Sequence, residues 1–254
     1  MFLAAVPEIQ ELYKNLESIL GELKLETLDW TGSSDIKMVL ILLGKDQASC
    51  RHSCPFCESK APWTTPGKLN TLGSLRAWHE KWIASGSDPK EKKNHQNMGN
   101  PPIVEGEDED KILELFVPME LHLLLGIIEK LLHELKRNVF PSLSDGKKFM
   151  TTFFKDNSIT VGVKQGGKLD GNACRDFLNA IDNLERAFQD HSVEVFLKGL
   201  PYIEALRKFN KVREKAFGMD LEEGWVEAIR EFEISYRGLR NKANKPISVT
   251  PKVN

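Results

Sequence analysis

The stretch PMELHLLLGIIEKLLHELKR, residues 118–137, decides the fold class of this chain. Its apolar residues recur three and four positions apart, which places them on one face of an α-helix. Pro118 suits the first turn, where its missing N–H costs no hydrogen bond. The apolar face consists of Leu121, Leu124, Leu125, Ile128, Leu131, Leu132 and Leu135. A face this wide has to be buried against other elements, so the stretch predicts a helix inside a packed helical domain.

The residues that follow continue the helical pattern. Asp170 or Asn172, after a Gly-rich turn at residues 165–171, is placed to cap a helix, and Gly218 suits the end of another. Further helices are expected over about residues 144–155, 170–189, 201–217 and 221–240. We therefore predict an all-helical domain over residues 111–245, followed by a strand, residues 246–254, that returns to the first part of the chain.

The residues before this domain predict a small α/β part. The expected elements are a strand at residues 1–6, a helix at 7–24, a strand at 25–30, a buried helix or turn at Lys37–Leu43 closed by Gly44, and an amphipathic helix at 69–84. The order strand–helix–strand is typical of an α/β layer. Residues 85–110 are rich in Gly, Pro, Asn and charge, so we expect a linker there, with a first domain over residues 1–84. The predicted fold class is mostly α with a small α/β part.

Composition limits the class of protein. The chain has 254 residues, 41% of them hydrophobic, and its 35 basic and 37 acidic residues give a net charge of −2. This content can bury a core, and the charge argues against an overall basic coat, although not against a local basic patch. There is no run of about 18 apolar residues, and the apolar start, Met1–Val6, lacks a basic region. We therefore expect an intracellular protein with no membrane span and no signal peptide.

Cys54 and Cys57 frame the sharpest local motif, CPFC. In a reduced compartment, two thiolates separated by two residues are typical of one half of a tetrahedral zinc site. Such a site needs four ligands, and Cys50 and His52 are close enough in sequence to complete it. The fold is the other source of ligands, through His79, His95, His122 or His133. Two alternatives stay open, namely a buried pair of thiols without metal and a redox-active pair.

Two weaker patterns involve carboxylates. His122, Glu129 and His133 fall on one side of the predicted helix, where Glu129 and His133 are one turn apart and could share a metal. A polar stripe beside the apolar face is the simpler interpretation. Asp35 follows a predicted strand, where a carboxylate can hold Mg²⁺ in a phosphoryl-transfer site. Taken alone, Asp35 is more simply interpreted as a helix N-cap.

The C-terminal end of the chain is basic. No acidic residue follows Glu233, whereas five cationic residues do: Arg237, Arg240, Lys242, Lys245 and Lys252. These side chains could contact a phosphate backbone in a salt-sensitive way, although solvated helix ends often carry similar charges. The sequence contains no Walker loop, G-x-S-x-G, H-E-x-x-H or dinucleotide fingerprint, so we expect no small-molecule cofactor.

Four stretches of the chain resemble landmarks of transposon-derived proteins of the ribonuclease-H-like DDE type, in the same order. They are SSDIKMVLILLGKDQASCRHSCPFCE at residues 33–58, PMELHLLLGIIEKLL at 118–132, GGKLDGNACRDFL at 166–178 and ISVTPKV at 247–253. In that family an aspartate in a D-x-K context precedes a short apolar helix and a Cys-Pro-x-Cys knuckle. The resemblance runs from about Leu3 to Val253 and extends more distantly to hAT transposases.

The resemblance implies a partial ribonuclease-H-like core over residues 1–84 and a helical insertion domain over residues 111–245. Asp35 would match the second of three carboxylates that hold Mg²⁺ or Mn²⁺ in an intact family member. Cys54 and Cys57 would match the first half of a zinc site that histidines after the insertion complete. The resemblance also implies a nuclear location, DNA as a partner, and a protein partner or homodimer.

The chain departs from the family pattern at both ends. In the family, the first carboxylate precedes the helix matched by residues 7–24, and a glutamate and paired histidines follow the stretch matched by VTPKV. With one of three carboxylates, we expect a truncated, central transposase-like fragment that binds DNA and zinc but does not cut DNA by itself. The alternative is a zinc-stabilised helical protein-interaction module with no nucleic-acid role.

Overall fold

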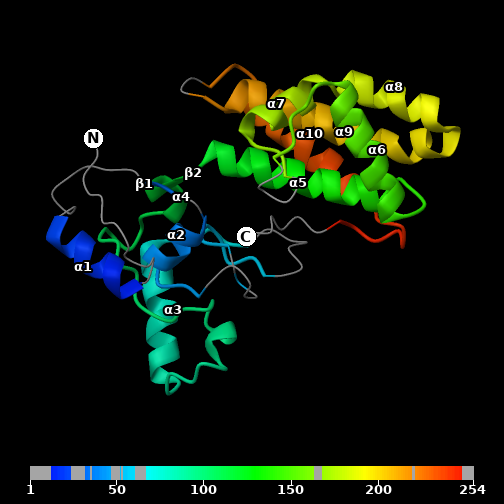
Figure 1. The fold of residues 1–254 in the computed structure, drawn as a ribbon. Helices are drawn as coiled ribbons and strands as arrows, with labels where there is room; N and C mark the ends of the chain where they lie inside the picture. Colours follow the sequence, from blue (N-terminus) through cyan, green and yellow to red (C-terminus); the bar gives the residue numbers. More distant parts are fainter. Residues whose placement is uncertain are drawn as a thin grey trace. The chain divides into compact units, whose positions relative to one another are not determined.

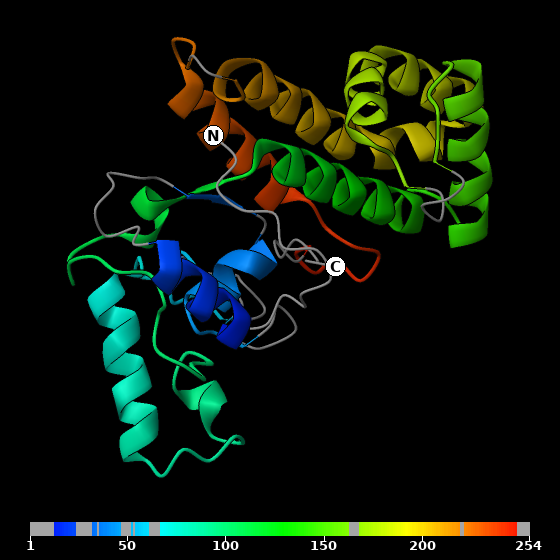
Figure 2. The ribbon, with the colours of Figure 1, turned by 60° about the vertical axis from the view of Figure 1, so that its left-hand side comes forward.

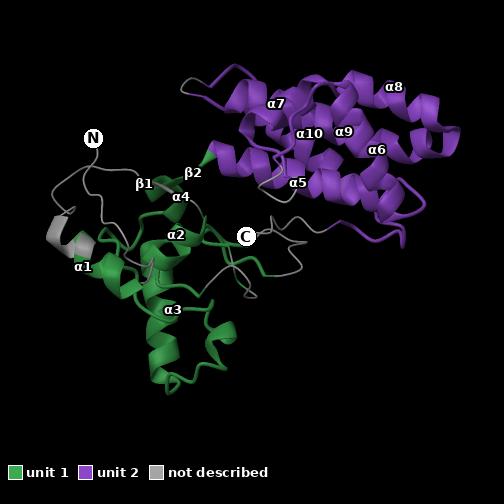
Figure 3. Ribbon diagram, in the orientation of Figure 1, with its two compact units in different colours: residues 1–119, 252–254 green, residues 120–251 purple. Residues whose placement is uncertain are grey.

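The computed structural model describes residues 13–23, 32–34, 36–46, 52, 54–60, 67–162, 168–218 and 221–247. The chain divides into two compact units, residues 1–119 with 252–254 and residues 120–251 (Figure 3). Most of the described residues are helical, which confirms the prediction of a mostly α fold. Among them, no helix combines the length and the apolar character needed to cross a membrane.

In its described residues, the first unit contains short helices and a pair of strands (Figure 1). The helices are α1 (Tyr13–Leu23), α2 (Ile36–Leu42), α3 (Leu72–Ala84), the 3₁₀ turn η2 (Lys92–Asn94) and α4 (Ile112–Leu115). Strand β1 (Gly32–Ser34) pairs in parallel with β2 (Phe116–Pro118), with Ser33 opposite Val117. This pair is the α/β part that the structure describes, and the strands predicted at 1–6 and 25–30 lie outside the described residues.

Helix α2 and the glycine after it confirm the prediction for Lys37–Leu43. Val39 and Leu40 are buried on α2, as expected for an apolar core helix. Gly44 follows with a φ of 70°, and its carbonyl accepts the amide N–H groups of Gly99 and Asn100 at 2.9 and 3.1 Å. A Cβ at residue 44 would overlap the backbone of Asn100, so both the turn and the close approach require glycine.

The segment predicted as a linker, residues 85–110, folds onto the first unit. Met98 and Val104 are buried in one hydrophobic cluster with Leu72 of α3. The N–H of Leu72 donates to the Asp110 carbonyl at 3.0 Å, so the segment also closes the start of α3. The segment is polar overall, so its composition predicted a linker. Two buried apolar residues are nevertheless sufficient to anchor it to the first unit.

The second unit is a helical bundle (Figures 1 and 2). Its helices are α5 (Glu120–Asn138), α6 (Leu143–Asp156), α7 (Gly171–Asn179), α8 (Ile181–His191), α9 (Val193–Ala216) and α10 (Trp225–Gly238). Helix α9 packs against α8 and α10, and α5 contacts α6, α7 and α9. Helix α5 confirms the helix predicted at 118–137, except that Pro118 ends β2 instead of lying in the first helical turn, and the helix starts at Glu120. Its predicted apolar face is buried at Leu124, Ile128, Leu131, Leu132 and Leu135, whereas Leu121 in the first turn is 46% exposed.

One predicted helix is two helices in the structure. Asp170 caps α7 as predicted, with its carboxylate accepting the Ala173 N–H at 2.9 Å. The helix does not continue to residue 189, because Ala180 leaves the helical conformation (φ −95°, ψ 14°) and α8 starts at Ile181. This change of direction allows Phe177 and Phe188 to be buried in the same core.

The helix predicted over residues 201–217 starts eight residues earlier, at Val193. The Ser192 hydroxyl caps it by accepting the Val195 N–H at 3.1 Å. Pro201 lies inside α9. The carbonyl four residues before it belongs to Leu197, which is 59% exposed, so water can satisfy the acceptor that proline leaves without a donor.

Candidate metal centre and nucleic-acid interface

The two thiols of the CPFC motif lie side by side in the first unit. The Sγ atoms of Cys54 and Cys57 are 3.3 Å apart, and both cysteines are free. Tetrahedral zinc bound about 2.3 Å from each sulfur would separate two thiolates by about 3.8 Å. A disulfide would require about 2.05 Å. The pair is therefore spaced more like two ligands of one metal than like a disulfide.

Backbone hydrogen bonds fix the turn that carries the thiols. The N–H of Glu58 donates to the Lys68 carbonyl, and the N–H of Asn70 donates to the Phe56 carbonyl, each at 2.9 Å. These bonds belong to a short antiparallel contact between the turn and the residues that lead into α3. The start of α3 and the thiol pair are therefore held in one local structure.

Two buried polar side chains brace the same turn. The side-chain amide of Asn70 donates to the Pro55 carbonyl at 2.8 Å, and Asn70 is fully buried. Lys45 Nζ donates to the Cys54 carbonyl at 3.0 Å, and Lys45 is 4% exposed. Buried polar groups that hydrogen-bond to a backbone restrain it strongly, because their loss would leave unpaired groups. These two hydrogen bonds therefore restrain the turn that carries Cys54 and Cys57.

The two thiols differ in acidity. The pKa of Cys57 is lowered to about 5, first by its hydrogen bond with Cys54 and further by hydrogen bonds from Ser59 and the Gly67 backbone, against an opposing effect of burial. The pKa of Cys54 is raised, first by the hydrogen bond with Cys57 and then by burial. Zinc binds thiolates, so Cys57 is a ready ligand at neutral pH, whereas Cys54 would release its proton on binding.

None of the other predicted ligands that the structure describes is grouped with this pair. Among the residues that the structure describes, no three His, Cys, Asp or Glu side chains are grouped so that they could hold a metal ion. His52 is half-buried, and Cys50 lies outside the described residues. His79 packs beside Trp82, and burial lowers its pKa. His95 packs edge-on against the Trp78 ring.

The histidines of α5 belong to the second unit. His122 and His133 are both exposed, and the helical rise separates them by about 16 Å. They therefore cannot bind one ion together. Glu129, the carboxylate expected to share a metal with His133, forms an ion pair with Lys168 at 3.2 Å. Glu129 therefore has a cationic partner on the surface of the second unit.

Asp35 and Cys174 are the two remaining residues considered for a chemical role. Asp35 lies outside the described residues, between Ser34, which ends β1, and Ile36, which starts α2. Cys174, the fourth cysteine, is buried in the core of the second unit, and burial raises its pKa to about 12. A thiol with so high a pKa is inert, so Cys174 serves packing.

The basic residues near the C-terminus differ in how they are engaged. Arg237 forms an ion pair with Glu233 at 2.8 Å. The Arg240 guanidinium donates to the carbonyls of Arg237 and Leu239, and Lys242 Nζ donates to the Pro141 carbonyl at 2.8 Å. In the described part of the chain, Arg240, Lys242 and Lys245 have no carboxylate partner, and Lys252 lies outside that part.

Sequence reasoning missed the residues that support the thiol pair. Lys45 and Asn70 are nine and fifteen positions from the backbone carbonyls that they hold. No spacing rule connects such positions, and both residue types are usually exposed, so the sequence carried no signal for them.

Compared with known proteins, the chain matches no family model, no curated protein and no solved structure.

Proposed function

We propose that this chain is a zinc- and DNA-binding part of a DDE-type transposase-like protein that acts in the nucleus. The observation that carries the proposal is the pair of thiols at Cys54 and Cys57, braced at 3.3 Å with a low pKa at Cys57. The order of the four resembling stretches supports the family, with a partial ribonuclease-H-like core over residues 1–84 and a helical insertion domain over residues 111–245.

Zinc would have a structural role in this proposal. Two thiolates from Cys54 and Cys57 would supply half of a tetrahedral site, and Cys50, His52, His122 and His133 remain the candidate completing ligands. The metal would fix the turn beside α3, because a bound ion stabilises the folded state relative to the unfolded chain. Asp35 would hold Mg²⁺ or Mn²⁺ only together with the other carboxylates of an intact family member.

DNA would be contacted by the basic residues after Glu233. Arg240, Lys242 and Lys245 are exposed and have no carboxylate partner among the described residues, although Arg240 and Lys242 also donate to backbone carbonyls. Arg237 and Lys252 were predicted in the same set. Contacts of this kind are made to phosphates, so they would give affinity without sequence preference.

Salt-dependent binding to a random-sequence DNA duplex tests this proposal. We expect the logarithm of the binding constant to fall linearly with the logarithm of salt concentration. Replacing Arg240, Lys242 and Lys245 by Gln should reduce the slope by about 0.9 for each phosphate that the variant no longer neutralises. The matched control replaces Lys147, Lys148 and Lys155, three exposed lysines of α6, by Gln. Equal weakening by both triple variants, or no salt-sensitive binding at all, would contradict the DNA contact.

A second candidate function is a zinc-stabilised helical module that binds another protein or a second copy of itself. This second function is favoured because two of the cationic side chains predicted to contact DNA already have partners within the protein. Arg237 pairs with Glu233, and the Arg240 guanidinium donates to backbone carbonyls. A protein that contains zinc but shows no salt-sensitive DNA binding would support this module over the first proposal.

A further inference from the structure

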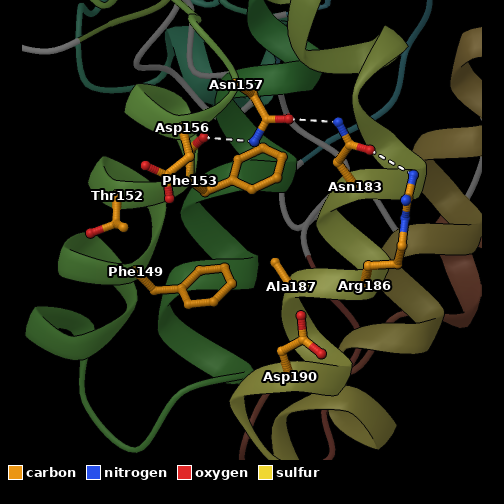
Figure 4. Close-up of a pocket in the computed structure, with 9 residues that line it drawn as sticks. All are labelled: Phe149, Thr152, Phe153, Asp156, Asn157, Asn183, Arg186, Ala187 and Asp190. Carbon is orange, nitrogen blue, oxygen red and sulfur yellow. Dashed lines mark hydrogen bonds between the residues drawn. The ribbon is translucent and has the colours of Figure 1, made fainter.

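A groove lies between α6 and α8 on the second unit, with a volume of about 380 Å³ (Figure 4). Its α6 wall contains Phe149, Thr152, Phe153 and Asp156. Its α8 wall contains Asn183, Arg186, Ala187 and Asp190. On each helix the four positions follow the spacing i, i+3, i+4, i+7, so each wall is two turns of one helix face. The groove therefore has the length of one heptad of an incoming helix.

The apolar part of the groove is held in place by contacts between aromatic rings. The Phe149 ring packs against Phe140 and Phe188, with ring centroids 4.9 and 5.3 Å away, and meets the His191 ring edge-on at 5.4 Å. Phe153 is buried beside it. A surface held in this way loses little conformational entropy when a ligand binds, which favours binding.

A chain of hydrogen bonds closes one end of the groove. Asn183 Nδ2 donates to Asn157 Oδ1 at 2.6 Å, and Arg186 donates to Asn183 Oδ1 at 2.8 Å and to the Asp182 carbonyl at 3.3 Å. In Figure 4 the Arg186 guanidinium points toward Asn183 and away from Asp190. Arg186 therefore does not neutralise the carboxylate at the other end.

Two carboxylates at opposite ends define the charge of the groove. Asp156 and Asp190 are exposed, and neither forms a hydrogen bond or ion pair with its side chain among the described residues. Phe149 and Ala187 lie between them (Figure 4). Two free carboxylates against one tethered guanidinium repel a polyanion such as DNA and attract cations.

We propose that the α6–α8 groove docks an amphipathic helix of a partner protein, in which cationic residues flank a short apolar stripe. In such a helix, residues seven positions apart are separated by about 10 Å and lie on one face. The apolar residues between them would cover Phe149 and Ala187, and the cations would meet Asp156 and Asp190. This docking depends on neither the zinc site nor the DNA contact, since it uses only residues of α6 and α8.

The probe is a fifteen-residue alanine-based helical peptide in which two lysines, seven positions apart, flank two leucines. Its twin carries glutamate in place of both lysines. Fluorescence anisotropy of the labelled peptides with the full chain should show binding of the lysine peptide and not of its twin. Asp156→Asn and Asp190→Asn should each weaken binding about three- to fivefold. Asp176→Asn, at an exposed carboxylate of α7 outside the groove, should leave it unchanged.

Several results would overturn the proposal. They are failure of the lysine peptide to bind, equal binding of the two peptides, and equal effects of Asp176→Asn and the groove variants. Self-association of the chain that Asp190→Asn abolishes would assign the groove to a second copy and so overturn it as well. Asp156, Asp176 and Asp190 are all exposed, so thermal unfolding of the variants should match that of the wild type and show that the fold is intact.

Discussion

Glu134 shows how single residues hold the second unit together. This buried carboxylate of α5 accepts hydrogen bonds from Lys130 Nζ at 2.6 Å and from the Asn138 amide at 2.9 Å. Asn138 also donates to the Tyr202 hydroxyl at 3.1 Å, which connects α5 to α9. Burial by itself raises the pKa of Glu134, but the hydrogen bonds from Lys130 and Asn138 and the charges of Lys130 and His133 together outweigh burial, so the pKa is lowered.

The stability of the second unit should therefore depend on the charge of Glu134. A lowered folded-state pKa means that ionised Glu134 stabilises the fold above its unfolded pKa of about 4.3. That contribution is lost as the pH falls through the folded value. We expect Glu134→Gln to lower the free energy of unfolding by about 1–3 kcal/mol at neutral pH. The difference in free energy of unfolding between this variant and the wild type should shrink as the pH falls below about 4.

Urea unfolding at a series of pH values measures this effect. The control is Glu227→Gln, at an exposed carboxylate of α10 whose nearest cation, Arg230, is 3.8 Å away. It should change stability little at any pH. A Glu134→Gln difference that stays constant from neutral to acidic pH would show that the ionised form of Glu134 does not stabilise the fold.

Among the contacts between elements, α8 and α9 are in close contact at Gly199. A Cβ on residue 199 would overlap the ring of Phe188, and both residues are buried. We expect Gly199→Ala to destabilise the unit by about 1–3 kcal/mol, because overlap in a packed core outweighs the better helix propensity of alanine. Gly238→Ala on α10 is the matched control, since a Cβ there meets open space. Thermal unfolding in which Gly199→Ala is as stable as the wild type would contradict this packing.

The same helices show which elements a sequence can predict. Helix α5 was predictable because it buries one face, so its apolar residues keep a helical period. Helix α9 packs against both α8 and α10, and it contains Pro201, although proline is more common in the first turn of a helix. The first two turns of α9 were therefore not predicted. Residues 85–110 were predicted as a linker because composition does not show that Met98 and Val104 reach the core of the first unit.

At the scale of the whole molecule, the candidate sites differ in what the sequence reveals. The Cys54–Cys57 pair was visible because a two-residue spacing alone brings two thiols together. Lys45 and Asn70, which fix that pair, depend on contacts between distant segments. The α6–α8 groove was not visible either, because its two walls become neighbours only when α6 and α8 pack side by side.

The zinc content of the full chain is a direct measure of zinc binding by Cys54 and Cys57. We expect metal analysis of reduced protein, purified without chelators, to give about one zinc per chain. Cys54→Ser or Cys57→Ser should remove this zinc, and Cys174→Ser, at a buried cysteine of the other unit, should retain it. A wild-type content below about 0.2 zinc per chain, or loss of zinc in Cys174→Ser alone, would contradict zinc binding by Cys54 and Cys57.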